Sequence, residues 1–465
     1  MKTVIVVGYV GILFFCNITF TFSQCFITGA DLSYVNSVES KGGTYQDVDG
    51  NAVDPYELFA NEGAKMIRLR LWHTPENNTD FCGNPISNSN LDDVLVAAQK
   101  IKANGMQFKL SIHYSDYFTD PVKQLMPAAW LNLDNSILLD SIGEYTINVL
   151  NKLLAQNTVP DIVSVGNETT WGFIDETTNT NGWGWPNDAG KYNFAFLLID
   201  NFNQVNNTNI KKAIHVTESS AIWLLELFEE KEITNFDIIG ISYYPFFSPE
   251  KSLADIGQIV KQLTETYSKE VMIFETGFTW TTSSADNYNN FVGNNGNTLS
   301  YSTTAEGQKN FLLDLAEVVD ENGGTGVLYW EPAWITSTLC DQWGQGSSYE
   351  NVGFFNFNDN NKALPAFDFF DFCGTNRIEE LTNHTAIANT FIFPNPAVSD
   401  ESIQVKSNLN FSRWILYDVN GRQIEAGNFN SKGSKEIKFS KKMKGIYFLH
   451  LFATEKKEII KKIVY

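Results

Sequence analysis

The stretch Val163–Phe173, VSVGNETTWGF, places an acid just beyond a short apolar run. The apolar part, Ile162–Val165, is typical of a buried strand, and Glu168 follows it after two residues. The same arrangement recurs in Glu270–Phe278, EVMIFETGF, where an apolar run ends at Glu275. A fold that gathers the ends of its strands would bring these two acids together.

Apolar, β-prone runs alternate with amphipathic helical patterns between residues 26 and 370. Strands are predicted at Phe26–Leu32, Lys65–Trp72, Gln107–Tyr114, Asp161–Glu168, Lys212–Glu218, Phe236–Pro245, Glu270–Phe278 and Gly324–Pro332. Helices are predicted at Pro55–Asn61, Asn90–Asn104, Asp134–Ala155, Ala189–Val205, Ala221–Lys231, Ser252–Ser268, Thr304–Asn322 and Ala363–Phe370. Short strands that are apolar along their length indicate a parallel sheet with both faces covered, and eight such units indicate a closed (β/α)8 TIM barrel.

A doubly wound open sheet is the alternative α/β arrangement. It would usually carry a glycine-rich phosphate-binding turn after its first strand. The corresponding segment here, Gly29–Ser33, reads GADLS and has no GxGxxG pattern. The barrel is therefore the favoured fold.

Polar and aromatic residues stand where the predicted strands end. In a (β/α)8 barrel these positions share one face, which is where active sites of this fold lie. We expect the following to bind a substrate: Asp31, Arg68, Trp72, His113, Asp116, Asn167, Tyr243, Trp330 and Trp334. Other strand-end residues on the same rim are Arg70, Tyr114, Glu218, Tyr244 and Glu331.

Glu168 and Glu275 end the fourth and seventh predicted strands. Hydrolysis of an acetal needs an acid for the leaving oxygen and a carboxylate that attacks, or directs water at, the anomeric carbon. Ends of the fourth and seventh strands face one another across a closed barrel, so the pair suits this chemistry. For either glutamate alone, an ion pair with Arg68 or Arg70 is the simpler explanation.

Charge is distributed unevenly along the chain. The whole sequence has 33 Lys and Arg against 54 Asp and Glu, a net charge of −21. Residues 391–465 have 13 Lys and Arg against 7 Asp and Glu, a balance of +6, which leaves −27 for the remainder. An acidic chain lacks the basic patches that bind phosphates, so nucleic acid is not an expected partner. The change of sign predicts a domain boundary near residues 380–390.

Residues 1–23 have the features of a secretory signal peptide, with Lys2 followed by a long apolar run and small residues before Gln24. A retained membrane anchor is the alternative, and a lipoprotein is disfavoured because Gln24 precedes Cys25. Removal of the signal would leave four cysteines, which in an exported protein suggests disulfides. The sequence has no CxxC motif or Cys/His metal spacing, so a zinc site is not expected.

Several motifs together resemble glycoside hydrolase family 53, the endo-β-1,4-galactanases. VGNE at Val165–Glu168 and FET at Phe274–Thr276 resemble the signatures of the retaining TIM-barrel glycosidase clan. The segments that narrow the resemblance to the family are Gly29–Val35, Lys65–Pro75, Ile112–Trp130, Ile241–Ser248, Ile273–Trp280 and Gly326–Ile335. They occur in the family's order across residues 26–373.

This resemblance implies roles for the two acids. Glu168 would be the general acid/base and Glu275 the nucleophile in cleavage of the β-1,4-galactan side chains of pectin, with retention of configuration. No cofactor is expected beyond a structural calcium ion that some members hold, for which Asp286 is the candidate here, although an ordinary polar loop is favoured. Thr169–Phe173 departs from the family pattern, which leaves the contacts beyond the cleaved bond open.

The cysteines can be placed on the predicted barrel. Cys25 precedes the first strand and Cys373 follows the last helix, so both lie at the bottom. Cys82 follows the second strand and Cys340 the eighth, so both lie at the top. Of the three possible connectivities, this favours Cys25–Cys373 with Cys82–Cys340.

The C-terminal region is predicted to be a separate all-β domain. A polar linker at residues 374–390 follows the catalytic domain, residues 24–373. Short alternating strands with turn signals in residues 391–465 predict a small β-sandwich. The pattern PNP…LYDVNGRQI…KGIYFLHL…KKIVY resembles the C-terminal sorting domain of type IX secretion cargo, which implies the outer-membrane secretion machinery as a partner. A carbohydrate-binding module is the alternative, although the segment has a single Trp, Trp414.

The sequence therefore predicts a secreted, monomeric, retaining endo-β-1,4-galactanase that acts on galactan or type I arabinogalactan. Another retaining endo-glycanase of the clan, a mannanase or xylanase, is one alternative. A non-catalytic glycan-binding barrel is the other, although both acids are present.

Overall fold

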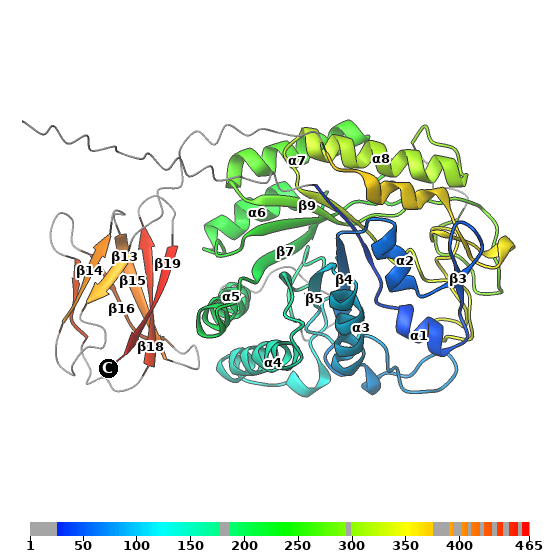
Figure 1. Cartoon of the computed structure of the whole chain (residues 1–465). Coiled ribbons are helices and arrows are strands. Elements are labelled where there is room, and N and C mark those ends of the chain that lie inside the picture. The colour runs from blue at the N-terminus through cyan, green and yellow to red at the C-terminus, as the bar shows by residue number, and fades with distance from the viewer. Residues whose placement is uncertain are drawn as a thin grey trace, which may run out of the picture.

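The computed structural model describes residues 26–175, 187–293, 299–374 and, in the C-terminal region, 390–393, 402–407, 411–418, 423–429, 435–439, 446–453 and 458–464. Eight parallel strands form a closed barrel in the order β1-β10-β9-β8-β7-β6-β5-β4 (Figure 1). They are β1 Ile27–Asp31, β4 Met66–Leu71, β5 Gln107–Ile112, β6 Ile162–Val165, β7 Lys211–Thr217, β8 Ile238–Ser242, β9 Glu270–Glu275 and β10 Gly326–Tyr329. The predicted TIM barrel and its eight strands are confirmed.

Helices surround the barrel and cover its outer face. They are α1 Val35–Ser40, α2 Pro55–Asn61, α3 Leu91–Ala103, α4 Asn135–Ala155, α5 Asn187–Asn206, α6 Ala221–Glu230, α7 Leu253–Tyr267 and α8 Ala305–Glu321. Helix starts follow local chemistry: Asp54 accepts a hydrogen bond from the Glu57 amide at 3.1 Å, with Pro55 in the first turn. None of the described helices is long and apolar enough to cross a bilayer.

Alternation along each strand separates the two sides of the barrel wall. In β4, Ile67, Leu69 and Leu71 belong to the main core between the strands and the helices. Arg68 and Arg70, on the opposite face, are buried inside the barrel and carry ion pairs there. The strand is apolar outward and charged inward, which is how a buried strand can deliver functional groups to the barrel's upper rim.

The predicted last short helix, Ala363–Phe370, is found two residues later as a 3-10 helix. Lys362–Ala363 is a two-residue strand, β12, and Pro365–Asp371 is a 3-10 helix. Its phenylalanines pack on other aromatic rings, with Phe367 and Phe370 at 4.9 Å and 5.5 Å from Phe59 between ring centres. Tertiary packing thus decides the conformation of a segment too short to form a stable α-helix alone.

A small sheet that was not predicted accompanies the barrel. It joins β2 Tyr45–Gln46, β3 Ala52–Val53, β11 Phe355–Asn356 and β12 in the order β11-β12-β2-β3. Each strand has two residues, and the pairings link residue 46 to residue 362. Such short, distant pairings leave no periodic signal in the sequence.

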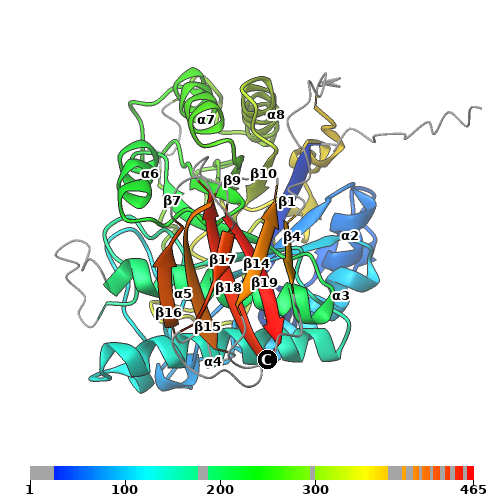
Figure 2. The ribbon, with the colours of Figure 1, turned by 90° about the vertical axis from the view of Figure 1, so that its left-hand side faces the viewer.

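Two antiparallel sheets form the C-terminal domain (Figure 2). One contains β13 Thr390–Phe393, β14 Ile403–Ser407 and β17 Lys435–Ile437; the other contains β15 Phe411–Asp418, β16 Gln423–Asn428, β18 Ile446–Ala453 and β19 Glu458–Val464. A separate apolar core includes Ile403, Val405 and Ile437 of the first sheet and Leu416 and Leu449 of the second. The predicted small β-sandwich is confirmed.

Gly240 of β8 offers a stability test of the barrel interior. A Cβ atom at this position would lie 1.8 Å from the Phe274 ring, which belongs to the inner core of the barrel. We expect Gly240→Ala to destabilise the protein by about 1–3 kcal/mol through overpacking. Gly293→Ala is the control, because a Cβ there meets nothing within 4 Å. Equal urea midpoints for the two variants would contradict the packing described.

Candidate active site

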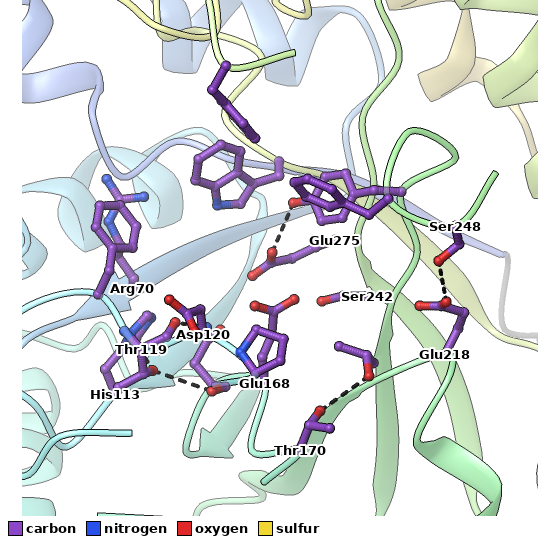
Figure 3. A pocket seen from close by; sticks show the side chains of 18 of the residues that line it. Arg70, His113, Thr119, Asp120, Glu168, Thr170, Glu218, Ser242, Ser248 and Glu275 are labelled. Carbon is purple, nitrogen blue, oxygen red and sulfur yellow. Dashed lines mark hydrogen bonds between the residues drawn. The ribbon is translucent and has the colours of Figure 1, made fainter. Parts of the chain in front are cut away.

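A cavity of about 890 Å³ opens at the ends of the barrel strands. Its aromatic lining consists of Phe118, Trp171, Trp223, Tyr244, Phe247, Tyr288, Phe291, Trp330, Trp334 and Trp343. Glu168 and Glu275 lie at its base, where their carboxyl groups face one another (Figure 3). Flat rings around a pair of carboxylates suit a sugar, whose C–H faces are apolar and whose edges carry hydroxyls.

Glu168 is held by a sharp turn after β6. Gly166 and Glu168 both have positive φ, 83° and 47°, and a side chain at Gly166 would lie 2.6 Å from Thr169. Gln124 donates from its amide to the carbonyl oxygens of Asn167 at 2.8 Å and Glu168 at 3.2 Å. Neighbouring segments thus fix a left-handed glutamate, which is a backbone conformation that clusters at functional sites.

Glu275 is the last residue of β9 and has two polar partners. Its Oε1 lies 2.6 Å from Nη2 of Arg68, and its Oε2 accepts a hydrogen bond from the Tyr244 hydroxyl at 2.9 Å. Glu275 therefore does form the ion pair with Arg68 that would be expected of a purely structural glutamate. It also faces Glu168, which a purely structural role would not require. Both partners favour an ionised carboxylate.

The two acids have unequal pKa values. Burial and the nearby charge of Glu275 raise the pKa of Glu168 well above its usual range, while a hydrogen bond with Ser242 and the charge of Arg68 oppose the rise. Burial also raises the pKa of Glu275, but Arg68 and Tyr244 pull it back. Because only Glu275 is ion-paired, Glu168 is the one that keeps its proton, and the pair is divided into an acid and a carboxylate.

Arg68 connects Glu275 and Asn167, the neighbour of Glu168, to the first strand. It is 1% exposed and forms an ion pair with Asp31 in addition to Glu275. Its Nη2 donates to Asn167 Oδ1 at 2.7 Å and its Nε donates to Ser111 Oγ at 3.0 Å. One guanidinium group therefore positions side chains from four strands or strand ends.

Two buried histidines near the acids are neutral. Burial lowers the pKa of His113 and of His215 well below the usual value, and Arg68 adds to the effect. The Thr119 amide donates to Nδ1 of His113 at 3.2 Å, so the ring proton lies on Nε2. That Nε2 is buried and no described residue accepts a hydrogen bond from it, and the His113 side chain belongs to the lining of the cavity.

Five of the nine predicted substrate-binding residues line the cavity: Arg68, His113, Asn167, Trp330 and Trp334. Asn167 is also committed within the protein, since its Oδ1 accepts from Arg68 and pairs with His215 at 3.0 Å. Asp31 and Asp116 lie outside the lining. Asp31 is buried beneath Arg68, and Asp116 accepts the backbone amides of Thr74 and Ala128 at 3.0 Å each.

Tyr243 and Trp72 also lie outside the lining. The Tyr243 hydroxyl donates to the carbonyl oxygen of Lys251 at 3.3 Å, away from the barrel axis, while Ser242 and Tyr244 line the cavity. The two-residue period of a strand would have selected Tyr244 in preference to Tyr243. Trp72 packs against Tyr117, with 4.5 Å between ring centres.

Asp286, the candidate calcium ligand, is engaged by protein groups. It accepts hydrogen bonds from the Tyr288 amide at 2.7 Å, the Thr336 hydroxyl at 2.8 Å and the Ser347 amide at 3.0 Å. Among the described residues there is no group of three or more His, Cys, Asp and Glu side chains that could hold a metal ion. The loop residues present there do not form a fitting calcium site.

A disulfide joins Cys82 and Cys340, whose Cα atoms are 6.1 Å apart, and this predicted pairing is confirmed. The other predicted pair includes Cys25, which lies outside the described residues. Residues 1–23 and the linker at 375–389, part of the predicted 374–390, also lie outside them.

In the C-terminal domain, Trp414 is 7% exposed and packs edge-on against Phe439, so it offers no open ring face to a sugar.

The sequence matches known families in both of its parts. Residues 27–370 match glycosyl hydrolase family 53, and residues 391–465 match the secretion system C-terminal sorting domain. The arabinogalactan endo-β-1,4-galactanase of Cellvibrio japonicus is 38% identical over 349 residues, which cover 74% of this chain and 90% of that protein. The endo-β-1,4-galactanase of Bacillus subtilis is 30% identical over 390 residues, covering 76% and 87%.

Solved structures agree with the fold of the barrel. The family 53 catalytic domain of Ignisphaera aggregans superposes with a TM-score of 0.68 at 29% identity, covering 76% of this chain and 98% of that one. A fungal β-1,4-galactanase structure superposes with a TM-score of 0.60 at 26% identity, covering 75% and 99%.

Tyr244→Phe tests the electrostatics of the pair. Loss of the hydroxyl removes a hydrogen bond that favours ionised Glu275, so we expect the pKa of Glu275 to rise. The titration can be followed by 13C NMR with carboxyl-labelled glutamate, with Glu275→Gln identifying the signal. Tyr349→Phe is the control, since this buried hydroxyl has no hydrogen-bond partner among the described residues. An unchanged or lowered pKa in Tyr244→Phe would contradict the described geometry.

Proposed function

The chain belongs to glycosyl hydrolase family 53, and from this premise we propose that it is an endo-β-1,4-galactanase that retains anomeric configuration. It is a glycoside hydrolase, and its proposed substrate is β-1,4-galactan, including the type I arabinogalactan of pectin. The observation that carries the mechanism is the unequal environment of two facing glutamates, half-buried Glu168 and buried Glu275.

Glu168 is the proposed general acid/base. In the first step it donates its proton to the glycosidic oxygen while the Glu275 carboxylate attacks the anomeric carbon, and the C–O bond to the leaving sugar breaks. In the second step Glu168 takes a proton from water, which attacks the same carbon and releases Glu275. Two inversions give net retention.

Arg68 and Tyr244 prepare Glu275 for attack by keeping it ionised and fixing its orientation. Burial keeps Glu168 protonated before the first step. Activity therefore requires a pH between the two pKa values: it falls as the pH rises through the raised pKa of Glu168 and as the pH drops through that of Glu275. His113 Nε2 and the rings of Trp330 and Trp334 are proposed to contact the sugar at the cleaved bond.

Glu168→Gln and Glu275→Gln test these roles. We expect each to lower kcat on galactan by at least about a thousandfold, because proton transfer or the covalent step is lost. Glu218→Gln is the control. Glu218 is another glutamate of the cavity, its carboxylate accepts a hydrogen bond from the Ser248 hydroxyl at 2.5 Å, and the substitution is expected to cost much less activity. Full activity in either of the first two variants would refute the mechanism.

The substrate is tested with the unmutated protein on galactan, arabinogalactan, mannan and xylan. Cleavage of mannan or xylan without galactan would favour another endo-glycanase, and binding without cleavage would favour a non-catalytic barrel. The first product observed by 1H NMR is expected to be the β-anomer; an α-anomer would indicate inversion.

Export is proposed to use both ends of the chain. Residues 1–23 would direct the chain across the inner membrane, and the sorting domain at 391–465 would be recognised at the outer membrane and place residues 24–373 at the surface or outside the cell. In a host with this secretion route, deletion of residues 391–465 is expected to retain active enzyme in the periplasm, because the barrel has its own core. Assays of medium and periplasm check this; equal secretion of the truncated chain would contradict it.

A further inference from the structure

Trp171 and Trp223 form an aromatic pair at one side of the cavity. Their ring centres are 5.1 Å apart with 31° between the planes, and both residues line the cavity. Trp171 is 46% exposed, although most large apolar side chains of the barrel are buried. A large, half-exposed aromatic ring at the mouth of a carbohydrate-sized cavity is suited to stack against the apolar face of a sugar.

The loop that carries Trp171 is held in place through the two residues that precede it. The amide of Thr169 donates to the carbonyl oxygen of His215 at 2.9 Å, and the hydroxyl of Thr170 lies 3.2 Å from that of Thr217 and 3.3 Å from that of Ser220. These contacts tie the segment after β6 to the end of β7 and to Ser220, which precedes α6, the helix that carries Trp223. The pair is therefore positioned before any ligand arrives, which reduces the entropy lost on binding.

The position of Trp171 and Trp223 relative to the two acids indicates which sugar of the substrate they contact. Trp171 follows Glu168 by three residues on the same loop, and Thr170 and Glu218 lie on one side of the two acids while Arg70 lies on the other (Figure 3). The general acid protonates the oxygen that departs with the leaving sugar, so the acid's own loop borders that sugar. Trp330, Trp334 and Trp343 also line the cavity.

We infer that Trp171 and Trp223 form a stacking platform for the sugar on the leaving-group side of the cleaved bond, an inference that rests on the proposed retaining galactanase. Trp171 lies in the Thr169–Phe173 segment, for which the resemblance to the family leaves the contacts beyond the cleaved bond open. The platform makes Trp171 a specificity-determining residue: it selects substrates that extend beyond the cleaved bond and does not take part in the bond chemistry.

The platform also governs the fate of the covalent intermediate. When a sugar occupies it after the first product has left, a hydroxyl of that sugar attacks the anomeric carbon in place of water. The bond to Glu275 breaks, Glu168 takes the hydroxyl proton, and a longer oligosaccharide forms. The ratio of transfer to hydrolysis therefore depends on Trp171.

Trp171→Ala separates the platform from the chemistry through two substrates. On β-1,4-galactan we expect kcat/KM to fall about tenfold, mainly through KM, since one aromatic contact is lost. On β-galactobiosyl fluoride, whose leaving group is a single ion with no sugar, kcat/KM should stay within about twofold of the unmutated value. Transfer products at high oligosaccharide concentration should decrease.

Two further variants control the experiment. Trp171→Phe keeps a ring and should recover most of the activity on galactan. Phe81→Ala removes an aromatic side chain that is 66% exposed but lies outside the cavity lining. It should leave kcat/KM unchanged on both substrates. Equal losses on both substrates, or no loss on galactan, would overturn the platform while leaving the proposed function intact. An unmutated protein that cleaves neither substrate would overturn the proposed function and this inference together.

Discussion

The buried guanidinium of Arg68 is the group on which the site depends. Transfer of a charge from water into a barrel interior is costly unless it is paired and fully hydrogen-bonded, so Arg68 requires Asp31, Glu275, Asn167 and Ser111 around it. Arg68 in turn fixes the positions of these four side chains and favours the ionised form of the Glu275 carboxylate. Removal of Arg68 would leave two buried carboxylates unpaired, which is why its contribution extends beyond a single ion pair.

Much of the fold follows from short-range pattern. The barrel strands are buried on both sides and therefore appear in the sequence as apolar runs. The position of Glu168 and Glu275 after such runs was enough to predict that both lie at strand ends. The type of the Pro365–Asp371 helix and the sheet joining residues 46 and 362 were missed, because packing between distant segments decides both. The same limit applies to the site: Asp31 is placed beneath Arg68 by an ion pair across two strands that no local pattern encodes.

Three residues with left-handed backbone lie at the rim where the cavity forms. Tyr114, Glu168 and Glu331 each follow a barrel strand with positive φ, which non-glycine residues adopt at a cost of about 1 kcal/mol or more. Tyr114 is held by a hydrogen bond to Thr146 at 2.9 Å, and Glu331 by its ion pair with Arg70. Contacts with a helix at Tyr114 and with an inner charge at Glu331 thus stabilise these turns.

The Cys82–Cys340 disulfide alters how the barrel is closed. Strand β1 completes the ring by pairing with β4 on one side and β10 on the other, and the disulfide joins the segments that follow those two neighbours. The covalent loop has a sequence separation of 258 and includes the helices α3 to α8. A single proteolytic cut within that loop would therefore leave both fragments chemically attached, so the barrel can be nicked without being divided in two.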